Sequence, residues 1–305
     1  MSEYNIVLTC EAMTRRFGTT QVLAPLDLKI ARGQIVGVVG SSGCGKSTFL
    51  NIAVGSLSPS SGRMLVSTLG AEHEVDGHGR DRGMVYQKYS LFPHLTALEN
   101  VALGPMLNET SIPGRAFGWI TGSWCHKRHE HLAKAEALLV KLGLCEALNR
   151  FPSELSGGMQ QRVAIARALI MEPEVLLLDE PFGALDEETR DDARQLLRDL
   201  YAENMKAVRA GLLAPYTIIM VTHSLEESVS VGDRVIGFSK HWNWRDQGHE
   251  SFPGATIVYD KAATREMAQA EELRKVVFAG RDLDPKMHCL FWNQVASGDV
   301  QGVLK

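Results

Sequence analysis

The chain has 305 residues, of which 45% are hydrophobic and 22% charged, and its formal net charge is −4. This is an ordinary globular composition with enough apolar residues for a large core. Proteins that bind nucleic acid are usually basic or carry a basic stripe, and this chain has neither, so no nucleic-acid partner is expected. The five widely spaced cysteines form no metal-binding pattern, which argues against a zinc site. No run approaches the ~20 apolar residues that span a bilayer, so any membrane role is expected to come through partner proteins.

Short apolar runs and helical patterns alternate from the N-terminal side onward. Residues 34–40 predict a buried strand that enters a glycine-rich loop, and residues 47–54 predict the helix that follows. Two further short strands are expected at residues 63–67 and 83–86.

Residues 98–148 are expected to be largely helical. Apolar residues recur there at helix spacing and define one apolar face: Leu132, Ala135, Leu138, Leu139 and Leu142. Residues 110–129 have no clear period and are expected to form a loop or short insertion. Their aromatic residues fit either a surface that docks a partner or a self-packed loop: Phe117, Trp119 and Trp124.

The second half of the chain predicts a helix at residues 156–170, a buried strand at 175–178, an exposed helix at 187–203 and another buried strand at 217–221. The stretch at 207–215 fits a loop or a helix extension. Alternating strands and helices indicate a mostly parallel sheet with helices on both faces.

The character of the chain changes after residue 239. Irregular structure is expected there, with a partly helical stretch at 258–275. This tail is too short for a typical added domain of about 100–150 residues. We therefore expect it to pack against the preceding residues or against a second copy of the chain.

Residues 40–47 read Gly-Ser-Ser-Gly-Cys-Gly-Lys-Ser, a complete GxxxxGK[ST] phosphate-binding loop between a predicted strand and a predicted helix. Glycines let backbone N–H groups curl around phosphate oxygens, and the helix N-terminus adds positive dipole character. The Lys46 ammonium is expected to reach the β- and γ-phosphates, and the Ser47 hydroxyl to ligate Mg²⁺. The residues expected to hold the nucleotide are Gly40, Ser41, Ser42, Gly43, Cys44, Gly45, Lys46, Ser47 and Thr48.

Cys44 lies inside this loop, close to a predicted helix N-terminus, where the pKa of a thiol can fall. Redox inhibition through Cys44 is one hypothesis, and an inert small side chain is the other.

Residues 175–180 read Val-Leu-Leu-Leu-Asp-Glu, a buried strand that ends in two acids. Ligands of open α/β sheets bind at the carboxyl ends of the strands. Beside a phosphate-binding loop, Asp179 is expected to hold Mg²⁺, and Glu180 to polarise the attacking water as general base.

Residues 155–158, Leu-Ser-Gly-Gly, open a predicted helix and suggest a second anion-binding helix N-terminus. A simple Ser156 N-cap is the alternative. Because a nucleotide needs only one phosphate-binding loop, we expect the second site to serve a nucleotide held by a second copy.

The run 155–162, LSGGMQQR, resembles the signature sequence of the ABC ATPase family. Other family landmarks appear in the expected order across residues 6–238: Gln87 resembles the Q-loop glutamine, Ala184-Leu185-Asp186 the D-loop, and His223 the switch histidine. Phe17 stands at about the position of the adenine-stacking aromatic. A core aromatic, or Arg15 or Arg16 over the base, are the alternatives at that position.

This resemblance implies an α/β fold: a P-loop NTPase (RecA-like) core with an antiparallel β subdomain and a helical signature subdomain at about residues 91–158. The cassette would occupy residues 1–238, and residues 239–305 would form a C-terminal extension of unknown role. The resemblance further implies hydrolysis of ATP at two composite sites of a head-to-tail homodimer.

The resemblance also implies a role for each site residue. Glu180, His223, Gln87 and Lys46 would be catalytic, and Ser47, Gln87 and Asp179 would bind Mg²⁺. Ser156, Gly157 and Gly158 would face the nucleotide of the other copy, and Asp186 would work across the dimer interface.

A single cassette without a membrane span resembles the nitrate/sulfonate/taurine branch of bacterial importers. That branch implies transmembrane permease subunits, a solute-binding protein, a small anionic solute and a place at the cytoplasmic face of the inner membrane. Two alternatives remain open. The first is a soluble ABC ATPase acting on nucleic acid or ribosomes. Such proteins have either a cassette split by a long coiled coil or two cassettes in tandem, and this chain has neither feature. A non-catalytic nucleotide sensor fits poorly with intact Glu180 and His223.

Overall fold

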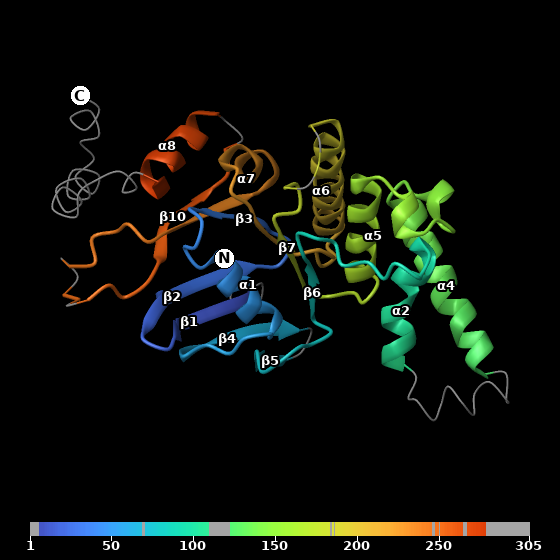
Figure 1. The fold of residues 1–305 in the computed structure, drawn as a ribbon, viewed down its shortest axis with the longest axis horizontal. Helices are drawn as coiled ribbons and strands as arrows, with labels where there is room; N and C mark the ends of the chain where they lie inside the picture. Colours follow the sequence, from blue (N-terminus) through green and yellow to red (C-terminus); the bar gives the residue numbers. More distant parts are fainter. Residues whose placement is uncertain are drawn as a thin grey trace.

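The computed structural model describes residues 6–68, 71–109, 123–183, 185, 187–245, 248–249, 251–264 and 267–278. Two β-sheets lie side by side, and helices extend away from them to one end of the molecule (Figure 1). None of the helices in these ranges combines the length and apolar character needed to cross a membrane.

The smaller sheet is antiparallel, with strand order β2-β1-β4-β5. Its strands are β1 (Ile6–Phe17), β2 (Thr20–Ala31), β4 (Ser61–Thr68) and β5 (Ala71–Glu74). Along β2 the buried residues Leu26, Leu28 and Ile30 alternate with exposed Asp27 and Lys29. This period of two places one face of the sheet on the core and the other toward solvent.

The larger sheet has strand order β10-β9-β3-β8-β7-β6. Its strands are β3 (Ile35–Gly40), β6 (Arg82–Val85), β7 (Val175–Asp179), β8 (Ile218–Val221), β9 (Arg234–Ser239) and β10 (Thr256–Ala262). All neighbours are parallel except β10, which pairs antiparallel with β9 at the edge. The central strands β3 and β8 are buried throughout because both faces of the sheet are covered.

Helix α1 (Lys46–Val54) lies between the two sheets. Its Phe49, Leu50 and Ile52 share one apolar core with residues of both sheets, among them Leu8 of β1 and Val38 of β3. The opposite face of the large sheet is covered by α5 (Gly157–Leu169) and α6 (Glu187–Arg209). The sheet therefore sits in the middle of a layered α/β core.

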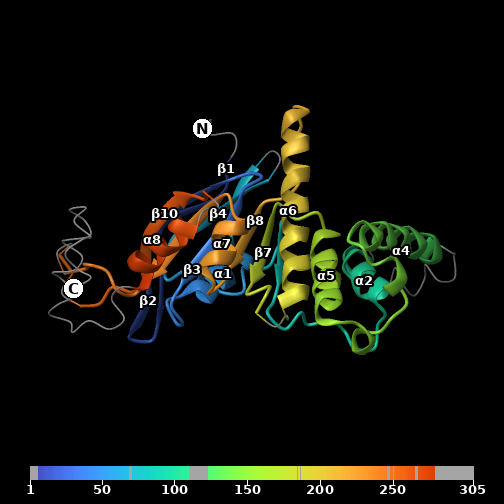
Figure 2. The ribbon, with the colours of Figure 1, turned by 90° about the horizontal axis from the view of Figure 1, so that it is seen from above.

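A helical subdomain lies beyond α5 and α6, at the end of the molecule away from β10 (Figures 1 and 2). It contains α2 (Ala97–Glu109), α4 (Ser123–Lys141) and the short 3-10 helices Cys145–Ala147 and Pro152–Glu154. Its small core, with Val101, Ala135 and Leu139, also includes Val163 of α5. The helix that carries the signature residues thus packs on both the sheet and the subdomain.

Part of the loop expected at residues 110–129 is helical, because α4 begins at Ser123. Residues 126–130 are all polar and exposed, so this part of α4 has no apolar face that would indicate a helix in the sequence. Residues 110–122, with Phe117 and Trp119, and the side chain of Trp124 lie outside the described residues.

Two expectations for the second half can be made more exact. Helix α6 continues to Arg209, so residues 207–209 are the helix extension that was one of the two alternatives for 207–215. The stretch expected to be partly helical at 258–275 is helical from Met267, whereas residues 258–262 belong to strand β10, which pairs with β9.

The tail packs on the larger sheet. Helices α7 (Leu225–Val231) and α8 (Met267–Phe278) share a core with β9 and β10 that includes Val235, Tyr259 and Leu273. The described part of the tail therefore packs against the preceding residues, as expected.

Candidate active site

The loop between β3 and α1 is folded tightly around the side chain of Lys46. The buried Lys46 Nζ donates to the carbonyl oxygen of Gly40 at 2.8 Å and to that of Ser41 at 3.1 Å. A Cβ atom on Gly40 would lie 2.5 Å from the Cys44 sulfur, and Gly45 has a φ of 91°, so both positions require glycine. Such a loop of glycines before a helix N-terminus fits a phosphate group.

The other loop residues fall into two groups. Ser42, Gly43 and Ser47 are exposed and accessible to a nucleotide, and Thr48 is half-buried. Cys44 is fully buried, and burial raises the pKa of its thiol against the opposing effect of Lys46. A reactive thiol needs access and a lowered pKa, so the structure favours the inert alternative for Cys44.

Asp179 and Glu180 stand at the carboxyl end of β7, on the side of the sheet where β3 leads into the phosphate-binding loop. Asp179 is half-buried, and burial followed by the charge of Glu180 raises the pKa of its carboxyl, whereas Lys46 lowers it. Within the described ranges nothing donates a hydrogen bond to the Asp179 carboxylate. A carboxylate in this setting is a suitable ligand for a hard cation, which prefers oxygen donors.

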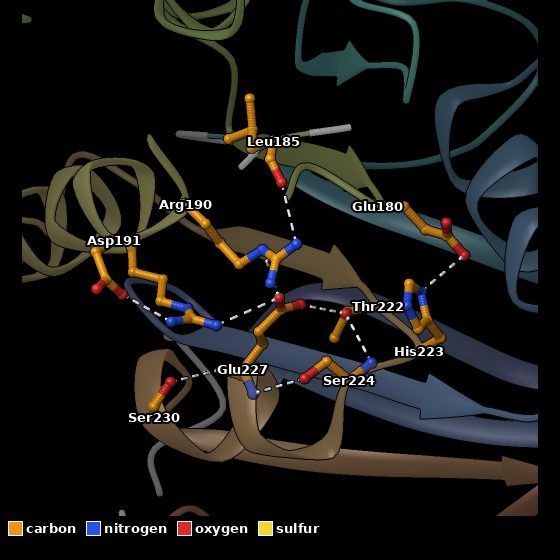
Figure 3. Close-up of polar contacts among 10 residues, drawn as sticks. Glu180, Leu185, Arg190, Asp191, Thr222, His223, Ser224, Glu227 and Ser230 are labelled. Carbon is orange, nitrogen blue, oxygen red and sulfur yellow. Dashed lines mark hydrogen bonds and ion pairs between the residues drawn. The ribbon is translucent and has the colours of Figure 1, made fainter. Parts of the chain in front are cut away.

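Glu180 meets two other predicted residues. Its Oε2 accepts a hydrogen bond from Gln87 Nε2 at 3.0 Å, and its Oε1 lies 3.6 Å from His223 Nδ1 (Figure 3). The three side chains come from the segment after β6, the end of β7 and the end of β8. The backbone of Glu180 has φ 46°, a left-handed conformation that costs about 1–3 kcal/mol in a non-glycine residue and is concentrated at functional sites.

The order of the strands explains why these residues meet. β3, β8 and β7 are adjacent and parallel, so their carboxyl ends lie along one edge. This edge carries the loop of Lys46, then His223, then Asp179 and Glu180. The side chain of His223 is 67% exposed and that of Glu180 28%, so both are accessible to a substrate in the loop.

The signature residues lie apart from this edge. Ser156 caps α5, and its Oγ accepts a hydrogen bond from the backbone N–H of Met159 at 3.3 Å. Ser156 and Gly157 are exposed at the helix N-terminus, whereas Gly158 is buried. A Cβ atom on Gly158 would lie 2.1 Å from Cγ2 of Thr189, so glycine allows α5 to approach α6 closely. Strand β7 and helix α6 separate α5 from α1 in both views of the fold (Figures 1 and 2).

Phe17 ends β1, and 45% of its side chain is exposed. The alternative of a core aromatic is therefore wrong. The guanidinium of the half-buried Arg15 lies 4.4 Å from the centre of the exposed Phe17 ring, so these two candidates lie side by side. Asp186 lies outside the described residues.

Sequence reasoning missed the residues behind His223. Glu227, in the first turn of α7, is buried and lies between His223 and two arginines of α6 (Figure 3). A capping signal, Ser224 followed three residues later by Glu227, was available in the sequence to find it.

Several known proteins are similar to this chain in sequence and in fold. The ABC transporter family matches residues 23–183. The Fe(3+) ions import ATP-binding protein FbpC of Brucella abortus (strain 2308) is 39% identical over 229 residues, which cover 75% of this chain and 57% of that protein. The glutamine transport ATP-binding protein GlnQ of Escherichia coli (strain K12) is 39% identical over 231 residues, or 75% of this chain and 85% of GlnQ. The taurine import ATP-binding protein TauB of Jannaschia sp. (strain CCS1) is 39% identical over 219 residues, or 72% of this chain and 70% of TauB.

Two solved structures support the fold. A nucleotide-free ATP-binding cassette from an ABC transporter has a TM-score of 0.66 at 22% identity, over 90% of this chain and 98% of that chain. The structure of cbiO1 from Clostridium perfringens, part of the ABC transporter complex cbiONQ, has a TM-score of 0.65 at 23% identity, over 94% of this chain and 98% of that chain.

The fold and the site define a P-loop nucleotide-binding protein with the residues of an ATPase. The chain belongs to the ABC transporter family, in which ATP-binding subunits hydrolyse ATP to power transport. The resemblance drawn from the signature and its accompanying motifs is confirmed, and relatives named for taurine and for aliphatic sulfonates are among the matches. The chain spans 57% of the length of its FbpC relative.

Proposed function

We propose that this chain is the ATP-hydrolysing subunit of a bacterial importer of a small anionic solute. It would work at the cytoplasmic face of the inner membrane, bound to transmembrane permease subunits that receive the solute from a solute-binding protein. The observation that carries the proposal is the contact of Glu180 with Gln87 and His223 beside the phosphate-binding loop. Relatives named for import of aliphatic sulfonates and of sulfate support an anionic solute, whereas FbpC and GlnQ, at similar identity, are named for Fe(3+) ions and glutamine.

Binding of ATP begins with a change at Lys46. Its ammonium is now satisfied by the carbonyl oxygens of Gly40 and Ser41. Phosphate oxygens of ATP carry full negative charge and accept stronger hydrogen bonds than carbonyls do. We infer that Lys46 exchanges the loop carbonyls for the β- and γ-phosphates, and that Ser41 to Thr48 hold the phosphates through backbone N–H groups and hydroxyls.

The residues at the strand edge fit Mg²⁺. Asp179 offers a carboxylate that receives no hydrogen bond within the described ranges, and Ser47 offers an exposed hydroxyl. Gln87 uses its amide nitrogen on Glu180, which leaves its amide oxygen available as a ligand. Bound Mg²⁺ would neutralise charge on the phosphates. We propose Ser47, Gln87 and Asp179 as the residues that hold it.

Hydrolysis then uses Glu180 as general base. The carboxylate takes a proton from the attacking water as the water oxygen bonds to the γ-phosphorus and the bond to the β-phosphate oxygen breaks. Gln87 fixes one Glu180 oxygen, and His223 lies near the other. The exposed His223 side chain would steady the γ-phosphate in line with the water.

Two copies would share each ATP. The exposed N-terminus of α5 is separated from the phosphate-binding loop of its own chain, so Ser156, Gly157 and Gly158 have no role there as an anion site. In a head-to-tail dimer they would face the ATP of the other copy, and Asp186 would lie at the interface. ATP would close this dimer, and hydrolysis would reopen it while Gln87 reports the change to the membrane partner. The cassette would comprise residues 1–238, with the helical subdomain at 91–158 and an extension at 239–305.

The transport role is tested by recovering the tagged chain from membranes in mild detergent. The proposal predicts that a protein with several membrane spans is recovered with it and raises its rate of ATP hydrolysis. Lys46→Ala is the control, which should recover the same partner without stimulation. Recovery of nucleic acid or ribosomes instead, with ATP hydrolysis stimulated by nucleic acid, would move the function to the soluble class.

A further inference from the structure

Glu227 is a buried carboxylate close to the active site that the proposed hydrolysis does not use. It lies in the first turn of α7, and only 7% of the residue is exposed. Figure 3 shows it between the end of β8 and the first turns of α6. A buried charge is costly unless it is paired and hydrogen-bonded, and Glu227 has partners on both sides.

On one side Glu227 closes a ring of hydrogen bonds around His223. Its Oε2 accepts from the Thr222 hydroxyl at 2.6 Å, and the same hydroxyl accepts from the backbone N–H of Ser224 at 3.0 Å. The Ser224 hydroxyl in turn accepts from the backbone N–H of Glu227 at 3.3 Å. His223 stands between Thr222 and Ser224, so the ring fixes the backbone on both sides of it.

On the other side Glu227 is held by two arginines of α6. Its Oε1 lies 3.8 Å from Nε of Arg190 and 3.6 Å from Nη2 of Arg194. Arg190 also donates through Nη2 to the carbonyl oxygen of Leu185 at 3.0 Å. Arg194 bonds instead to the exposed carboxylate of Asp191, at 2.7 Å.

One end of this network reaches the active site, because His223 lies 3.6 Å from Glu180. The other end is Leu185, which follows Glu180 in the chain and precedes α6. One carboxylate therefore joins the segment after the general base to the turn that carries the histidine. A displacement of Leu185 would be passed through Arg190 to Glu227, and from there to His223.

We propose that Glu227 is a positioning residue for ATP hydrolysis, which holds His223 through Thr222 and couples it to the Leu185 segment through Arg190. The inference rests on the proposed function, because it concerns the same reaction. Glu227 itself does not contact the phosphate-binding loop, so its loss should lower turnover and leave binding of ATP unchanged.

The hydroxyl of Thr222 gives the sharpest test, since it can be removed with little change of shape. Thr222→Val should lower the kcat for ATP hydrolysis by between ~10-fold and ~100-fold, because a small misplacement of a catalytic group has effects of that size. The KM for ATP should change by less than about twofold, as expected for a group that acts only in the transition state. Thr222→Ser keeps the hydroxyl and should restore kcat to near the wild-type value.

The two arginines provide a matched pair. Arg190→Gln removes the contact with Leu185 and one partner of Glu227, whereas Arg194→Gln removes the other partner of Glu227 and the exposed ion pair with Asp191. We expect the larger loss of kcat for Arg190→Gln. Equal effects of the two changes would contradict the coupling to the Leu185 segment.

A double-mutant cycle shows whether Glu227 acts through His223. Glu227→Gln should lower kcat in the wild-type chain and have no further effect in His223→Ala. Full additivity, or wild-type kcat in Thr222→Val, would overturn the inference. Absence of ATP hydrolysis in the wild-type chain recovered with its membrane partner would instead overturn the proposed function. Thermal melting of each variant, together with its affinity for ATP, identifies changes that act only through loss of fold.

Discussion

Lys46, Gln87, Glu180 and His223 each contact one another or the nearby backbone. Lys46 bonds to loop carbonyls, and Gln87 and His223 flank the two oxygens of Glu180. The left-handed backbone of Glu180 is a local strain that the surrounding strands maintain. Gln87, Glu180 and His223 therefore lie within contact distance of one another, whereas Lys46 must exchange its loop carbonyls for the phosphates.

The phosphate-binding loop and the two acids after an apolar run could be proposed from the sequence pattern itself. Gln87 and His223 were proposed only through the family resemblance. Properties set by packing were not predictable. The burial of Cys44, the exposure of Phe17 and the contact of Thr222 with Glu227 depend on neighbours distant in the chain or on the turn geometry.

The thiols give a prediction at this scale. Burial raises the pKa of Cys10 to about 12 and also raises that of Cys44, whereas Cys145 is exposed. The reactive form is the thiolate, and a raised pKa keeps it scarce until the pH exceeds that value. At pH 8 a mild alkylating reagent should therefore modify Cys145 at least ~10-fold faster than Cys10 or Cys44.

Peptide mapping by mass spectrometry at increasing times measures the three rates in the native protein, with unfolded protein as the control in which all react. Rapid native labelling of Cys44, with loss of ATP hydrolysis that Cys44→Ser prevents, would revive the redox hypothesis.

At the scale of elements, the site is a consequence of strand order. Three neighbouring parallel strands, β3, β8 and β7, place their carboxyl ends together. These strands were predictable because a strand buried on both faces is a continuous apolar run. Strands β1 and β2 were expected only through the family resemblance. Their pairing has register shifts, such as that between Cys10 and Met13, which disturb the alternation that would mark them.

The last turns of helix α6, where the sequence fitted either a loop or a helix extension, have a specific partner. Asn204 is 1% exposed, and its amide nitrogen donates to the carbonyl oxygens of Gly33, at 2.9 Å, and Tyr216, at 2.6 Å. Its amide oxygen accepts from the backbone N–H of Tyr216 at 3.0 Å. The end of α6 is thus tied to the entrances of β3 and β8, the strands that lead to Lys46 and His223.

Asn204→Ala should therefore destabilise the fold. It leaves half-buried backbone groups of Gly33 and Tyr216 without their partner, which lowers the free energy of unfolding by about 1–3 kcal/mol. Urea denaturation measures this difference. Gln195→Ala, an exposed change on the same helix that removes a bond to Asp199, is the control and should alter the free energy by less than about 0.5 kcal/mol. Equal effects of the two changes would contradict the role assigned to Asn204.

At the scale of the whole molecule, each chain carries the two parts of the proposed composite site at two separate places. The phosphate-binding loop with its acids lies at the sheet edge, and the exposed N-terminus of α5 lies beyond α6. In the tail, β10 extends the larger sheet beside β9, and α8 packs on these two strands. The family resemblance implied which residues of two copies would meet. Only the three-dimensional structure shows that the two parts of the site lie apart within one chain.

A dimer that depends on ATP is the prediction at this scale. Glu180→Gln should bind ATP without hydrolysing it, and the trapped chain should migrate as a dimer in size-exclusion chromatography with light scattering. Without ATP it should migrate as a monomer. Ser156→Arg in the same background should bind ATP and stay monomeric, because it blocks the helix N-terminus that would face the other copy in the proposed dimer. A dimer that persists in that double variant would contradict the composite site.

Phosphate release by the wild-type chain and by Glu180→Gln, measured under the same conditions with Mg²⁺, tests whether Glu180 activates water for attack on ATP. We expect equal affinity for ATP and a kcat at least ~100-fold lower in Glu180→Gln, the usual contribution of a general base. Phosphate release at the wild-type rate by Glu180→Gln would contradict the assignment of the base and the mechanism built on it.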